Sequence, residues 1–150
     1  MELTFGLPKI LKIFEQVHSG RYYTVPKLAV GTLLTSGAAP WTLGAYVEVV
    51  PASIMTQYGY VVGIYMYGVT VNTDYIVELA IGPVGSESTI FSAYHSVQSI
   101  VGGVVAQTII PAVYEPLPVA VKIPKDTRVS ARCADSTGGL TIRTRVKYKT

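Results

Sequence analysis

The side chains that could act as a nucleophile, a general base or a metal ligand are few: two histidines, His18 and His95, and one cysteine, Cys133. Nucleophilic catalysis needs a base beside the nucleophile, and a zinc site needs several histidines or cysteines at short spacings. His95 has no second histidine or cysteine near it in the sequence, and His18 lies at the end of an expected helix, where a solvated or capping side chain is typical. We expect Cys133 to be a small core residue.

The carboxylates likewise do not indicate a site for acid–base chemistry. Asp74 and Glu78 share one face of an expected strand but lie about 13–14 Å apart by strand rise, and whether Glu48 or Glu87 completes a pair across strands is left open. The chain contains no GxSxG, P-loop, HExxH, CxxC or dinucleotide-binding glycine pattern. We therefore expect no enzyme activity, no cofactor and no small-molecule substrate.

Charge is distributed unevenly along the chain. Only 14% of the residues are charged against 49% hydrophobic, which fits one compact domain whose surface is polar or covered by other protein. Residues 1–27 carry a net charge of +2, residues 28–121 of −5 and residues 122–150 of +6, which gives the formal total of +3. Such asymmetry within one domain indicates an interaction surface.

Residues 8–20 predict the single helix of the chain, within an N-terminal helical arm that covers residues 1–20. Pro8 suits the first helical position and Gly20 follows the last. Because so short a helix does not persist alone in water, its apolar stripe must dock on its own domain, a sister subunit or a larger partner. Its weakly cationic polar side disfavours a membrane surface, and no apolar run is long enough to span a membrane. The stripe comprises Ile10, Leu11, Ile13, Phe14 and Val17.

From Arg21 onward the periodicity is that of strands, with runs rich in Val, Ile, Thr and Tyr separated by Gly, Pro, Ser and Asp. About eight to ten short strands at regular spacing indicate a β-sandwich or a closed barrel. We expect an all-β domain over residues 21–150, a jelly-roll-like antiparallel β-sandwich. The run from Asp74 to Ile81 alternates in polarity and predicts a strand with one buried face.

The segment from Tyr60 to Val69 differs, because neither of its alternating faces is polar. A strand of this kind is covered on both sides, and with few helices available we expect a second subunit to cover one of them. Tyrosine, of which the chain has 11, is enriched at such interfaces. The alternative is that the tyrosines fill the core of the sandwich and its edges. The candidate subunit interface comprises Tyr60, Tyr65, Met66 and Tyr67.

The last three expected strands, around residues 119–123, 127–134 and 140–148, are joined by short turns and predict a meander. Strand alternation then places side chains such as Val119, Cys133 and Ile142 on the inner face. The outer face collects seven basic residues, which are Lys122, Arg128, Arg132, Arg143, Arg145, Lys147 and Lys149.

Three interpretations of this basic face compete. It could bind nucleic acid, although it lacks interleaved aromatic side chains for stacking on a single strand. It could be a solvated sheet face, which is ordinary for antiparallel sheets. We favour the third interpretation, docking against acidic protein in a neighbouring copy or a larger assembly, because complementary charge fixes partner choice and register.

Residues 35–50 have the sequence TSGAAPWTLGAYVEVV, residues 78–87 ELAIGPVGSE and residues 123–132 IPKDTRVSAR. In style and motif order these segments, within a likeness that spans residues 30–148, resemble small virion structural proteins of tailed bacteriophages. The resemblance implies a homo-oligomeric β-sandwich attached to the particle, such as a capsid decoration (cement) protein.

The leading hypothesis is therefore a decoration protein that forms a homo-oligomer, for which we expect a trimer, and binds the major capsid protein to stabilise the shell. Such a protein would pass from the host cytoplasm to the capsid surface of the virion. The runner-up is a fibre, tail or baseplate module that binds host glycans, with Trp41 stacking on sugars. A nucleic-acid-binding module is the third hypothesis, and we expect no membrane partner.

Overall fold

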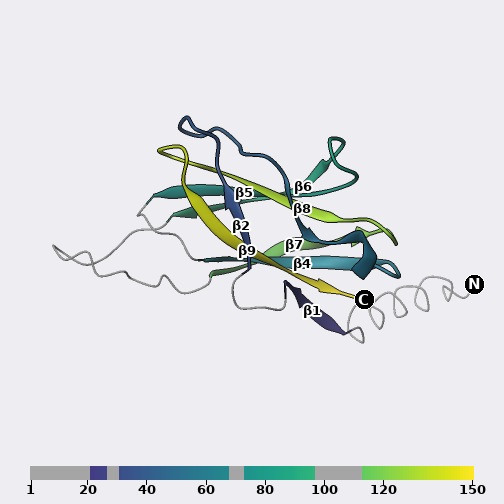
Figure 1. Ribbon diagram of the computed structural model, residues 1–150. Coiled ribbons are helices and arrows are strands. Elements are labelled where there is room, and N and C mark those ends of the chain that lie inside the picture. The colour runs from purple at the N-terminus through teal and green to yellow at the C-terminus, as the bar shows by residue number, and fades with distance from the viewer. Residues whose placement is uncertain (1–20, 27–30, 68–72, 97–112) are drawn as a thin grey trace, which may run out of the picture.

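The computed structural model describes residues 21–26, 31–67, 73–96 and 113–150, which form two antiparallel sheets packed face to face (Figure 1). The larger sheet contains β1 (Tyr22–Val25), β2 (Thr32–Thr35), β4 (Gly59–Tyr67), β7 (Val113–Ile123) and β9 (Thr141–Lys149). The smaller sheet contains β3 (Val47–Val50), β5 (Asp74–Ile81), β6 (Ser88–Ser96) and β8 (Val129–Asp135). A short 3-10 turn, Ala52–Ile54, follows β3. The prediction of an all-β sandwich is confirmed, whereas the expected arm, its helix and its stripe lie outside the described residues.

The strand order is that of a jelly roll. Strand β2 pairs with β9, β3 with β8, β4 with β7 and β5 with β6, all antiparallel. These nested pairs describe one long hairpin that is rolled so that its successive segments alternate between the two sheets. Strand β1 lengthens the β2 edge, because it pairs with the end of β9 while β2 pairs with its beginning.

The core lies between the sheets and follows the alternation of the strands. In β5, Tyr75, Val77 and Leu79 are fully buried, which confirms the expected one-sided strand. Cys133 of β8 is also fully buried, as expected for a core residue. Burial raises the pKa of its thiol to about 12, with a further contribution from the nearby Asp135 carboxylate.

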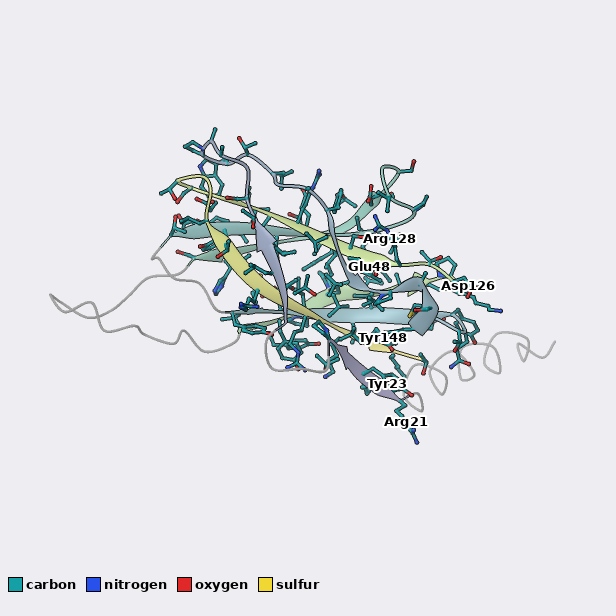
Figure 2. All side chains as sticks on the ribbon, viewed as in Figure 1. Arg21, Tyr23, Glu48, Asp126, Arg128 and Tyr148 are labelled. Carbon is teal, nitrogen blue, oxygen red and sulfur yellow. The ribbon has the colours of Figure 1, made fainter. Side chains whose placement is uncertain are left out.

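The expected C-terminal meander is wrong. Strand β8 lies in the smaller sheet between β3 and β5, whereas β7 and β9 flank β4 in the larger sheet. Figure 2 shows the consequence, because Arg128, just before β8, lies on one layer and Tyr148 of β9 on the other. The short turns between these strands therefore carry the chain from one sheet to the other, as a jelly roll requires, instead of joining neighbours.

Strand β7 also departs from regular alternation. Its ladder with β4 jumps from Val61 opposite Val121 to Gly63 opposite Pro116, so four residues of β7 bulge out of register. As a result Leu117 is buried, whereas Val119, expected on the inner face, is 75% exposed.

Candidate functional site

The outward side chains of β9 and β4 form a ladder in which basic and tyrosine residues face each other. The alternating sequence of β9 buries Ile142, Thr144, Val146 and Tyr148, so its four basic residues project from the opposite face. Across the ladder Lys149 faces Tyr60, Arg145 faces Tyr65 and Arg143 faces Tyr67. We call the tyrosine–basic face the outward residues Tyr22, Tyr60, Tyr65, Tyr67, Tyr114, Lys122, Arg143, Arg145, Lys147 and Lys149.

One basic residue of β9 has no tyrosine opposite it on β4, and β7 supplies the aromatic ring at this position. Lys147 faces Gly63, and the ring of Tyr114 from β7 lies over this glycine, where an added Cβ would collide with it. Tyr114 also packs against Tyr65, with 4.8 Å between ring centroids. Gly63 therefore keeps the aromatic surface continuous across β4 by leaving room for the Tyr114 ring.

The lysines of this face lie against tyrosine rings. Lys147 Nζ is 5.0 Å from the ring centroid of Tyr22 and 5.3 Å from that of Tyr114, and Lys149 Nζ is 5.5 Å from Tyr22. On the other side of β4, Lys122 Nζ is 4.8 Å from the ring of Tyr58. These cation–π contacts hold the ammonium groups in place without neutralising them.

Lys149 is the most unusual of these cations. It is only 2% exposed, and within the described part of the chain its ammonium group has no hydrogen-bond partner. A buried ammonium without a partner is costly, and the contact with the Tyr22 ring offsets part of that cost. Arg145 is fixed differently, because its Nε donates a hydrogen bond to the carbonyl of Pro26 at 2.9 Å.

Arg132 of β8 and Arg128, which directly precedes β8, lie in another environment. On the smaller sheet Arg132 pairs with Glu78, its cross-strand neighbour on β5, with 2.7 Å between Nη2 and Oε2. Arg128 pairs with Glu87 and donates a hydrogen bond from Nε to the carbonyl of Gly82 at 2.9 Å. Among the described residues no such ion pair joins Lys122, Lys147 or Lys149 to a carboxylate.

The expected seven-residue basic face is thus divided by the sheet topology. Lys122 and the four basic residues of β9 come together on the larger sheet, but Arg128 and Arg132 do not join them, because β8 belongs to the smaller sheet. The expectation that aromatic side chains are missing from the basic face is also wrong. Its tyrosines come from β1, β4 and β7, and only the pairing of these distant strands with β9 reveals them.

The candidate subunit interface merges with this face. Tyr60, Tyr65 and Tyr67 point outward, whereas Met66 is 1% exposed and belongs to the core, so its placement at an interface is wrong. The register shift in β4 between Val61 and Gly63 brings Met66 into phase with the inner face. Tyr22 and Tyr114 were missed, since nothing in the sequence indicates their strand partners. The binding roles of all these residues stay predictions.

The histidine and acidic residues form no metal centre in the part of the chain that the structure describes, where no three His, Cys, Asp or Glu side chains gather as ligands. His95 is half-buried on β6, and burial lowers its pKa while the Glu115 carboxylate acts in the opposite direction. Within the same residues no helix is long and apolar enough to cross a membrane.

No protein-family model and no curated protein matches this chain. Among solved structures, it is similar to the Eiger TNF of S. frugiperda, with 14% identity and a TM-score of 0.44 over 87% of this chain and 92% of that one. It is also similar to a chain of the infectious bursal disease virus Gt strain, with 11% identity and a TM-score of 0.41 over 88% of this chain. A chain of the T13 particle of that virus gives 15% identity and a TM-score of 0.38 over 87% of this chain.

The present chain spans about a third of the two viral chains, 33% and 31% of their lengths. With identities of 11–15% and TM-scores of 0.38–0.44, these likenesses carry no argument about function. The assignment of the fold rests on the strand order alone.

Proposed function

We propose that this protein is a structural component of a virus particle, a jelly-roll subunit that associates with copies of itself and attaches to the acidic surface of a capsid shell. The observation that carries the proposal is the tyrosine–basic face, whose lysines have no ion-pair partner among the described residues. Within this proposal the protein acts as a decoration or cement protein, a trimer on the virion surface, and its partner is the major capsid protein.

The composition of the face supports a protein partner. Tyrosine and arginine are the residue types enriched at protein interfaces, and five tyrosines alternate there with five basic residues. The rings and ammonium groups already hold one another in place. Docking therefore immobilises few additional side chains, which lowers the entropic cost of binding.

The charge of the face supports an acidic partner. Lys147 Nζ lies 5.0 Å from the Tyr22 ring centroid and 5.3 Å from that of Tyr114, and no carboxylate among the described residues pairs with it. A carboxylate of the partner placed beside the Lys147 ammonium would form a charge-assisted hydrogen bond with it. Arg128 and Arg132 cannot serve in this way, because Glu87 and Glu78 already neutralise them.

Co-sedimentation of the full chain with capsid shells of the virus that encodes it tests the proposal. The wild-type protein should sediment with the shells, and the K122E/K147E variant should lose about 100-fold in affinity, since charge reversal at an interface costs several kcal/mol. Lys125, an exposed lysine of the β7–β8 turn, provides the control, and K125E should bind as the wild type does. Wild-type protein that ignores the shells, or equal binding of all three proteins, would refute the proposal.

Single-stranded nucleic acid is a second candidate partner, favoured by the tyrosines that interleave with the cations. Bases stack on aromatic rings while the phosphates meet the basic groups. This function predicts binding to oligo-dT that weakens steeply with salt and is impaired by Y65A. A protein that binds shells but not oligo-dT excludes it.

A further inference from the structure

The smaller sheet carries an exposed aromatic pair at the end where β5 begins and β6 ends. Trp41, from the segment between β2 and β3, is 46% exposed and Tyr94 of β6 is 61% exposed. Their ring centroids are 6.5 Å apart and their planes differ by only 24°. The two rings are nearly parallel and together present a broad apolar surface.

Trp41 is held rigidly, although it lies in a loop. Its backbone has a φ of 57°, an uncommon conformation for a bulky residue, and its N–H donates a hydrogen bond to the carbonyl of Asp135 at 2.7 Å. The Asp135 carboxylate in turn accepts hydrogen bonds from Ser36 and from the backbone N–H groups of Thr137, Gly138 and Leu140. This buried carboxylate therefore connects the Trp41 loop to the β8–β9 turn.

A carboxylate lies beside the aromatic pair. Partial desolvation and a hydrogen bond with the Asp74 side chain both raise the pKa of Tyr94. Asp74 is anchored to the same β8–β9 turn as Trp41, because its carbonyl accepts a hydrogen bond from the N–H of Ser136 at 3.0 Å. No basic side chain forms an ion pair with Asp74 among the described residues.

These three side chains fit the chemistry of a neutral sugar. The apolar C–H face of a pyranose packs on an aromatic ring, and a neighbouring carboxylate accepts strong hydrogen bonds from sugar hydroxyls. The lone carboxylate disfavours anionic ligands such as phosphates. An organic cation is bound by aromatic rings that surround it on several sides, whereas these two nearly parallel rings form a flat surface.

We propose that Trp41, Tyr94 and Asp74 form a binding site for a neutral saccharide on the smaller sheet. The site lies on the opposite layer of the sandwich from the tyrosine–basic face, so one molecule can bind a protein shell with one sheet and a glycan with the other. Rigid attachment of both Trp41 and Asp74 to one turn means that little order has to be gained on binding.

Trp41 is the single tryptophan of the chain, so intrinsic fluorescence reports on this site directly. We expect at least one neutral oligosaccharide from a panel of malto-, cello-, chito- and galacto-oligosaccharides to change the Trp41 emission saturably. Y94A and D74N should each weaken that binding about tenfold or more, because they remove a stacking ring and a charged acceptor. Y58A removes a similarly exposed tyrosine on the larger sheet and should bind as the wild type does.

Three results would overturn the saccharide site. The first is the absence of any saturable change with all four sugar classes up to about 10 mM, the limit of weak specific binding. The second is sugar binding that Y94A and D74N leave unchanged while their melting temperatures match the wild type. The third is a response of Trp41 to tetramethylammonium in place of the sugars. None of these measurements involves the shell, so they fail or succeed independently of the proposed attachment.

Discussion

The outer faces of the two sheets are built from similar residues but differ in how their charges are satisfied. On the smaller sheet Arg132 of β8 pairs with Glu78 of β5, and Arg128, just before β8, pairs with Glu87 from the turn that follows β5. On the larger sheet the lysines lie against tyrosine rings, and within the described residues no carboxylate pairs with them. One basic segment of sequence therefore supplies both an internally neutralised face and a face that favours an external anion.

This difference between the two faces explains part of the uneven distribution of charge along the chain. The acidic middle segment and the basic end segment are partly complementary within one molecule, since Glu78 and Glu87 come from the first and their arginines from the second. The lysines without an ion-pair partner among the described residues, Lys122, Lys147 and Lys149, lie on the larger sheet. The arginines of the smaller sheet are already paired, whereas the ammonium groups of Lys122 and Lys147 on the larger sheet have no ion-pair partner among the described residues and are available for binding.

The largest effect that separates the two faces concerns binding. The K122E/K147E variant should lose about 100-fold in affinity for shells, whereas R132E should leave binding within about twofold, because Arg132 is neutralised on the other sheet. Sedimentation titrations of both variants measure the contrast. A similar loss in R132E would show that the two faces act together.

A large effect on stability should arise at the turn that supports the smaller sheet. D135A removes the acceptor of several buried hydrogen bonds and should lower the free energy of unfolding by about 3 kcal/mol. Urea denaturation measures this loss, with the conservative D135N as the comparison. A D135A protein as stable as the wild type would contradict the role of this carboxylate.

Acid should reproduce part of that loss. Burial alone would raise the pKa of Asp135, but the hydrogen bonds from Ser36, Thr137 and Gly138 outweigh it and hold the pKa at about 2. Because this pKa lies below that of an unfolded aspartate, the stabilisation is complete above about pH 4 and is lost as the pH falls towards 2, by about 2 kcal/mol. The wild type should show this decline in urea midpoints, and D135N should lack it.

A smaller effect should follow from breaking one ion pair of the smaller sheet. E78Q leaves Arg132 partly buried without its charged partner and should lower the free energy of unfolding by about 1 kcal/mol. K147Q on the larger sheet should change stability by less than about 0.5 kcal/mol, because no ion pair is lost there. Thermal unfolding of the two variants compares the faces directly, and equal losses would contradict their different charge states.

The layered architecture could be predicted from sequence, because alternation such as that of Asp74–Ile81 is a local property of the chain. The neighbours of each strand could not. A short turn such as residues 124–128 fits a meander as well as a crossing between sheets, and only the packing of the whole chain decides between them. This is why Arg128 and Arg132 were expected on the wrong surface.

The candidate site, like the fold, could be predicted from the sequence only in its local features. The outward position of the β9 cations follows from alternation alone, but the tyrosines beside them come from strands far away in sequence. The bulges in β4 and β7 shift the phase of Met66 and Val119, and no residue pattern indicates such shifts. The stacking of Trp41 on Tyr94 likewise depends on contacts between distant segments.

The most direct test of the proposed attachment is the reactivity of individual lysines. Mass spectrometry after amine labelling should show that Lys122 and Lys147 react in the free protein and are protected when the protein is bound to capsid shells. Lys125, 65% exposed in the turn between β7 and β8, should react equally in both states. Equal protection of all three lysines, or unchanged reactivity of Lys122 and Lys147 on the shell, would contradict attachment through the tyrosine–basic face.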